Sequence, residues 1–144
     1  MTVKPRIVRA LRDARTRMRD AAAADHSVTT AARERAEQQL ADEQRALEAA
    51  LDAAAGRLAG ARTVWEVHHV AEGTGVHRLA VLDAAARHHQ AVHASNATAA
   101  KLHERTRQLK TAERLVDMVE DVRAKREATA EQKSADDMAG ARRK

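Results

Sequence analysis

The chain has 144 residues, with 26 Lys and Arg against 21 Asp and Glu, one Trp, and neither Phe nor Tyr. This composition is typical of long helices and coiled coils, because a globular core normally needs the area that aromatic side chains bury. The absence of Cys excludes disulfides and thiol chemistry, and no apolar run reaches the roughly 18 residues that a membrane span needs. We therefore expect one all-α domain over residues 1–144, in the cytoplasm and without membrane insertion.

A first helix is predicted over residues 5–71. Pro5 stands in the first turn, where a helix tolerates proline. Beyond it, the spacing of mostly apolar residues alternates between four and three, which is the pattern of a coiled-coil seam. The residues of this predicted seam are Ile7, Leu11, Ala14, Met18, Ala21, Asp25, Val28 and Ala32.

The middle of the chain carries a turn signal, Glu72-Gly73-Thr74-Gly75. Gly costs about 1 kcal/mol against Ala within a helix and adopts turn conformations freely, so two glycines flanking one Thr predict a turn over 72–75. A return helix then covers residues 76–139. The predicted fold is a long two-helix antiparallel coiled-coil hairpin with its turn near Gly73-Gly75 and both termini at one end.

A turn at Thr74 also predicts which residues face each other. Leu40 would meet Leu109, Leu47 would meet Leu102, and Trp65 would meet Leu82 and so clamp the hairpin. The alternative for this only aromatic residue is an exposed docking knob. The predicted seam of the return helix consists of Leu79, Leu82, Ala86, His89, His93, Leu102, Leu109, Val116 and Val119.

Apolar residues at the end opposite the turn exceed what one partner helix covers. Leu115, Met118 and Val122 widen the stripe of the return helix. Ile7, Leu11 and Met18 find mainly Ala and charged residues opposite them in this register. We expect this end either to fray or to be covered by a partner.

Most of the histidines cluster around the predicted turn and the return helix. His89 and His93 are four residues apart, which places two imidazoles on one helical face as a metal would require. The supporting carboxylates of a zinc site are missing, so solvated or half-buried histidines are favoured over a metal site. The cluster comprises His68, His69, His77, His88, His89, His93 and His103.

Charge is concentrated at both ends of the chain. Residues 1–24 carry seven Lys and Arg against two Asp, and residues 123–144 carry seven against four acidic residues. In the predicted hairpin these two segments meet, which makes the open end cationic. Lys and Arg on helices can neutralise phosphates, and Arg142-Arg143-Lys144 adds to this charge, but the aromatic platforms of single-strand binders are absent. No catalytic grouping of nucleophile, base and carboxylate is visible, so we expect no enzyme and no cofactor.

The segment from Leu109 to Arg143 reads LKTAERLVDMVEDVRAKREATAEQKSADDMAGARR. It resembles the C-terminal signature of the flagellar export protein FliJ and of its type III secretion counterparts of the YscO type. The match rests on the Glu-Gln-Lys-x-x-Asp-Asp step formed by Glu131, Gln132, Lys133, Asp136 and Asp137. The basic opening PRIVRALRDARTRMRDAAAAD resembles that family's N-terminal helix.

The resemblance implies a non-enzymatic stalk and escort factor, monomeric alone, whose open end enters the ring of an export ATPase. Its other implied partners are the export-gate membrane protein, at the inner face of the membrane, and substrate chaperones. The residues implied to contact the ring are Arg6, Arg9, Arg12, Arg126, Glu131, Gln132 and Lys133. Two alternatives remain open from the residues alone. One is a basic hairpin that binds nucleic acid, and the other is a generic cytoplasmic coiled-coil scaffold or parallel dimer.

Overall fold

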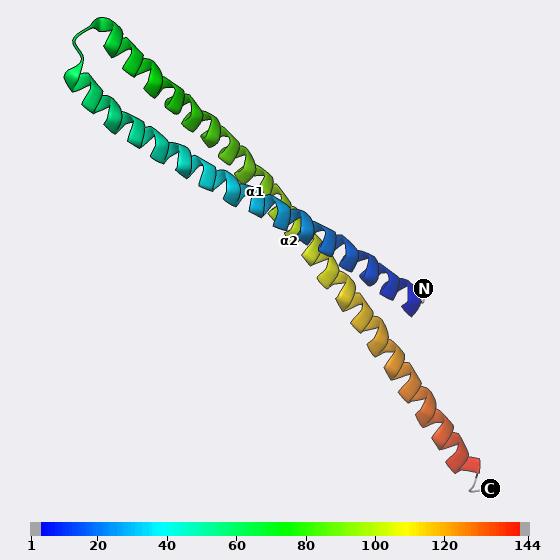
Figure 1. Ribbon diagram of the computed structural model, residues 1–144. Helices are drawn as coiled ribbons and strands as arrows, with labels where there is room; N and C mark the ends of the chain where they lie inside the picture. Colours follow the sequence, from blue (N-terminus) through cyan, green and yellow to red (C-terminus); the bar gives the residue numbers. More distant parts are fainter. Residues whose placement is uncertain (1–3, 142–144) are drawn as a thin grey trace. The chain divides into compact units, whose positions relative to one another are not determined.

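Two long helices make up the computed structural model, which describes residues 4–141. Helix α1 spans Pro5–Gly60 and helix α2 spans Val64–Ala141, joined by three residues (Figure 1). The helices run antiparallel and pack against each other, so the predicted all-α hairpin is confirmed. The chain divides into two compact units: residues 24–100, which include the turn, form unit 2, and residues 1–23 with 101–144 form unit 1.

The turn lies at residues 61–63, so the prediction of a turn at 72–75 is wrong. Gly73 and Gly75 are helical residues of α2, and no described residue, glycine included, has a positive φ. Thr74 is buried, and its hydroxyl donates to the carbonyl of Ala71 at 2.9 Å. The glycines lower helix propensity here without demanding a turn. The predicted bounds 5–71 and 76–139 therefore become 5–60 and 64–141.

A capping box starts α2. The hydroxyl of Thr63 accepts the N–H of Glu66 at 3.2 Å, and the carboxylate of Glu66 accepts the N–H of Thr63 at 3.1 Å and that of Arg62 at 2.7 Å. These bonds satisfy donors that a helix N-terminus otherwise leaves without partners. They hold the pKa of Glu66 below its ordinary value, chiefly through the N–H of Arg62 and then that of Thr63. The sequence Thr-x-x-Glu at 63–66 is the signal that fixes the turn.

The seam between the helices consists of positions with a strict four-three spacing in which every residue is buried or half-buried. In α1 the seam residues are Val8, Arg12, Arg15, Arg19 and Ala22 in unit 1, and His26, Thr29, Arg33, Ala36, Leu40, Glu43, Leu47, Ala50 and Ala54 in unit 2. In α2 they are Val70, Thr74, His77, Val81, Ala84, His88, Ala91, Ser95 and Thr98 in unit 2, and Leu102, Arg105, Leu109, Ala112, Val116 and Val119 in unit 1.

The predicted seam is therefore only partly right. Leu102, Leu109, Val116 and Val119 are confirmed, whereas the α1 seam lies one residue later than predicted, so that Ile7, for example, is 61% exposed. In the first half of α2 the seam lies two residues later than predicted: the stripe of Leu79, Leu82, Ala86, His89 and His93 gives way to Val81, Ala84, His88, Ala91 and Ser95.

The facing pairs predicted from a turn at Thr74 are also wrong. In unit 1, Arg15 donates to Gln108 at 2.6 Å, which places Leu109 beside the start of α1 and not beside Leu40. In unit 2, Thr98 lies 2.7 Å from the hydroxyl of Thr29 and 3.1 Å from the ring nitrogen of His26. This polar layer in the seam of unit 2 includes the buried Ser95 and contributes little apolar burial.

Candidate partner-binding surface

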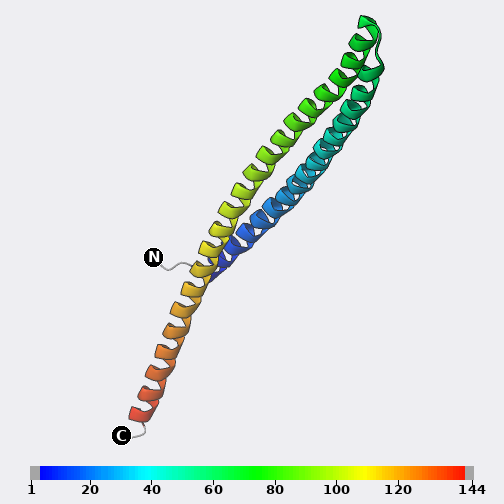
Figure 2. The ribbon, with the colours of Figure 1, turned by 90° about the vertical axis from the view of Figure 1, so that its left-hand side faces the viewer.

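The earlier turn leaves α2 longer than α1, and in unit 1 it continues past the beginning of α1. The ion pair between Arg9 and Glu120 (2.8 Å) places the first turns of α1 beside residue 120. From residue 121 to residue 139 every residue of α2 is exposed, and Figure 2 shows this stretch without a helix beside it. We call residues 121–139 the projecting segment.

The predicted signature residues lie on the projecting segment. Arg126, Glu131, Gln132 and Lys133 are all exposed, so none of them contributes to packing between the helices. Successive helical residues are rotated by about 100°, which places Lys133 and Arg126 on one face and Glu131 on the opposite face. The segment therefore offers different charges in different directions around one helix.

The cationic face of the projecting segment follows the spacing 122, 126, 129, 133. Val122, Arg126, Thr129 and Lys133 line a shallow groove of about 410 Å³ together with Lys125 and Ala130. The three cations flank small and apolar side chains, an arrangement that suits an anionic partner surface. Nearby, the carboxylate of Glu127 accepts a bond of 2.6 Å from Arg123, which raises the pKa of that guanidinium.

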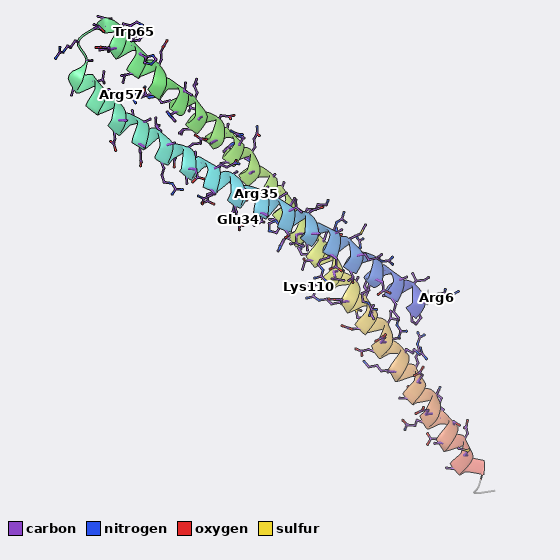
Figure 3. The ribbon with its side chains drawn as sticks, viewed as in Figure 1. Arg6, Glu34, Arg35, Arg57, Trp65 and Lys110 are labelled. Atoms are coloured by element: carbon purple, nitrogen blue, oxygen red, sulfur yellow. The ribbon has the colours of Figure 1, made fainter. Side chains whose placement is uncertain are left out.

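The predicted arginines of α1 lie elsewhere in unit 1. Arg6 is exposed at the start of α1 (Figure 3) and takes part in none of the ion pairs found among residues 4–141. Arg9 pairs with Glu120 across the helices, with both side chains about half exposed. Arg12 is half-buried at a seam position and pairs with its neighbour Asp13 at 2.9 Å.

The structure does not bring the two basic segments together. The basic start of α1 lies beside residues near Glu120, whereas Lys133 lies more than three helical turns further along α2. The prediction of one cationic open end is therefore wrong: unit 1 has a basic stretch on α1 and, separately, the projecting segment. Arg142, Arg143 and Lys144 lie outside the described residues.

Trp65 does not clamp the helices as predicted. It is 71% exposed, stacks on His69 with ring centroids 5.4 Å apart, and lies in the first turn of α2 next to the loop (Figure 3). Leu79 and Leu82, its predicted contacts, are also mostly exposed. The alternative prediction, a docking knob, remains a prediction that these positions allow.

The histidines are distributed over several faces. His77 and His88 occupy seam positions and are half-buried, as is His26 of α1. His89 and His93 are exposed and meet edge to face with centroids 4.4 Å apart. Over residues 4–141, no group of three or more His, Cys, Asp or Glu side chains could hold a metal ion.

No helix within residues 4–141 is long and apolar enough to cross a membrane. Comparison with protein-family models, with curated proteins and with solved structures finds no match to this chain. The candidate surface therefore depends on the geometry of the projecting segment and on the residues that it carries.

Proposed function

We propose that this chain is a non-enzymatic stalk and escort factor of a flagellar or type III protein export apparatus, which binds the ring of the export ATPase and promotes its assembly or activity. The observation that carries the proposal is the projecting segment, which leaves the signature residues Glu131, Gln132 and Lys133 on a single helix exposed on all sides.

The arrangement of charge supports a partner that surrounds the helix. A flat surface would contact either the face of Arg126 and Lys133 or the opposite face of Glu131, whereas the inside of a ring can contact both. A single helix with its side chains is about 10–12 Å across, so it enters a narrower opening than a pair of helices does. In this proposal Arg126 and Lys133 contact acidic groups of the ring, and Glu131 and Gln132 contact donors on the opposite wall.

The start of α1 supplies a second contact at the rim of the ring. Arg6 is exposed and Arg9 holds only an exposed ion pair, which contributes little to stability and is readily exchanged. Arg12 pairs with Asp13 from a half-buried position and contributes by holding the seam. The export-gate membrane protein and substrate chaperones are the further partners in this proposal, which places the protein in the cytoplasm at the inner face of the gate.

The test measures ATP hydrolysis and ring assembly by the export ATPase of the same organism, with and without this protein. We expect the native chain to raise both. The double variant Arg126→Ala/Lys133→Ala should bind about tenfold more weakly or worse, as expected for the loss of two charged contacts. The matched control, Arg45→Ala/Arg87→Ala, removes two exposed cations of unit 2 and should behave as the native chain. An ATPase that forms no complex with the native chain would refute the proposal.

The cationic face of the projecting segment favours nucleic-acid binding as the second candidate. Lys125, Arg126 and Lys133 could each neutralise a phosphate, and such binding falls steeply with salt. Titration of duplex DNA and of tRNA at low and at physiological salt distinguishes the two functions. Strong, salt-dependent binding without any effect on the ATPase would support this second candidate over the first.

A further inference from the structure

Unit 1 carries large apolar side chains that lie outside the seam. Each belongs to a position directly before a seam position or before its continuation: Leu11 precedes Arg12, and Leu115 precedes Val116. Because all share this relation to the seam, they turn to the same side of the helix pair. We call this set the apolar face of unit 1; its residues are Ile7, Leu11 and Met18 of α1 and Leu115, Met118 and Val122 of α2.

A groove joins the two halves of this face. It has a volume of about 170 Å³ and is lined by Leu11 and Arg15 from α1 and by Gln108, Thr111, Ala112 and Leu115 from α2. Leu11 and Leu115 therefore border one continuous surface. The six side chains are each 40–63% exposed.

This surface is large for a chain without a partner. At these exposures the six residues present on the order of 500 Å² of apolar area, whereas one patch on a monomeric protein rarely exceeds a few hundred Å². A standard interface buries about 800 Å² on each partner, with an apolar centre and a polar rim. The apolar face provides such a centre, and charged residues border it along both helices.

We propose that the occupant of this face is a second copy of the same chain, in a two-fold dimer in which the two units 1 run in the same direction. In this arrangement α1 of one copy lies against α2 of the other at the same level, and the four helices of the two units form a bundle. An interface of this kind is self-complementary, since each contact occurs twice.

The charges at the rim match this arrangement. Contacts within unit 1 give the levels: Arg9 lies beside Glu120, Leu11 beside Leu115, and Met18 beside Arg105. At these levels, exposed acidic and basic residues of the two helices oppose each other across the dimer. The expected pairs are Arg6 with Asp121, Asp13 with Arg114, and Asp20 with Arg107 of the second copy.

This dimer differs from the monomer that the family resemblance implies. It uses none of Arg126, Glu131, Gln132 and Lys133, so it does not depend on the proposed function. Opposite charges in register steer the association and select the parallel arrangement, while burial of the apolar face supplies its affinity.

The test is the mass of the full chain in solution, measured by sedimentation equilibrium over a range of concentrations. We expect the native chain to reach twice its mass of 15.7 kDa. Met118→Lys should raise the dissociation constant about tenfold or more, because it buries a charge at the centre of the interface. The matched control is Met138→Lys on the projecting segment, since these two methionines are 63% and 64% exposed; the control should dimerise as the native chain does. Circular dichroism checks that both variants keep their helical content.

A charge exchange tests the partner and the register. Asp13→Arg and Arg114→Asp should each weaken the dimer several-fold, and the double variant, in which the pair is reversed, should regain most of the lost affinity. A native chain that stays monomeric, a Met118→Lys variant that dimerises as tightly as the native chain, or a double variant that recovers nothing would each overturn the proposal.

Discussion

Replacing Gly73 and Gly75 by alanine separates the turn found in the structure from the turn that the sequence first indicates. Both glycines are helical, neither has a positive φ, and a Cβ built on either meets no atom within 4 Å. Alanine is favoured over glycine within a helix by about 0.5–1 kcal/mol, because it lowers the entropy of the unfolded chain. The double variant Gly73→Ala/Gly75→Ala should therefore gain about 1–2 kcal/mol, a rise of roughly 3–8 °C in melting temperature.

The gain is measured by urea denaturation followed with far-UV circular dichroism. Amide hydrogen exchange should show slower exchange at residues 72–80, where the helix is strengthened. The sign of the effect decides the question, because a turn at these residues would require conformations that alanine adopts only with strain. A double variant less stable than the native chain would refute a continuous α2 and restore a turn at 72–75.

Three further changes test the cap, its pH dependence and the seam. Thr63→Ala removes the hydroxyl that accepts the N–H of Glu66, so it should cost about 1 kcal/mol and speed hydrogen exchange at the start of α2; unchanged exchange would contradict the capping box. Because the pKa of Glu66 is lower in the folded chain, its stabilisation is present above the ordinary value of 4.5 and is lost as the pH falls through the lowered folded pKa. Denaturation of Glu66→Gln across this acid range should show a flatter pH dependence than the native chain, and an identical profile would argue against the bonds of Glu66. Leu109→Ala empties a buried seam position and should cost about 2–3 kcal/mol, whereas Leu79→Ala, at a site 68% exposed, should stay within about 0.5 kcal/mol; equal costs would contradict the seam.

Fold class follows from the sequence because composition and the spacing of apolar residues act over the whole chain. The start of α1 at Pro5 and the seam from Leu102 to Val119 could also be predicted, since there the largest apolar residues do face the other helix. The turn was misplaced because the Gly-Thr-Gly signal was weighed only as a propensity. Two glycines cost a long helix little, while the capping box at Thr63 satisfies several backbone donors at one point.

The candidate surface was predicted by residue but not by arrangement. Exposed charges such as Arg126 and Lys133 can be recognised on any helical pattern. Which of them lie together depends on the register, and a shift of the turn by some ten residues moves every facing pair by about twice that number. The projecting segment is a consequence of this shift, because a shorter α1 leaves the end of α2 without a partner helix.

The seam of α1 was misplaced for a different reason: in unit 1 the largest apolar residues lie beside the seam and not in it. Arg12, Arg15 and Arg19 occupy seam positions, and the Nε atom of Arg19 is buried without a hydrogen-bond partner among the described residues. Polar groups at such positions fix register at a cost in stability. The hydrophobic residues that could offset this cost face solvent instead, so most of the apolar burial open to unit 1 is gained only when another surface covers Leu11, Leu115 and Met118. The same feature that defeats a seam assignment from hydrophobicity alone is thus the physical reason to expect association.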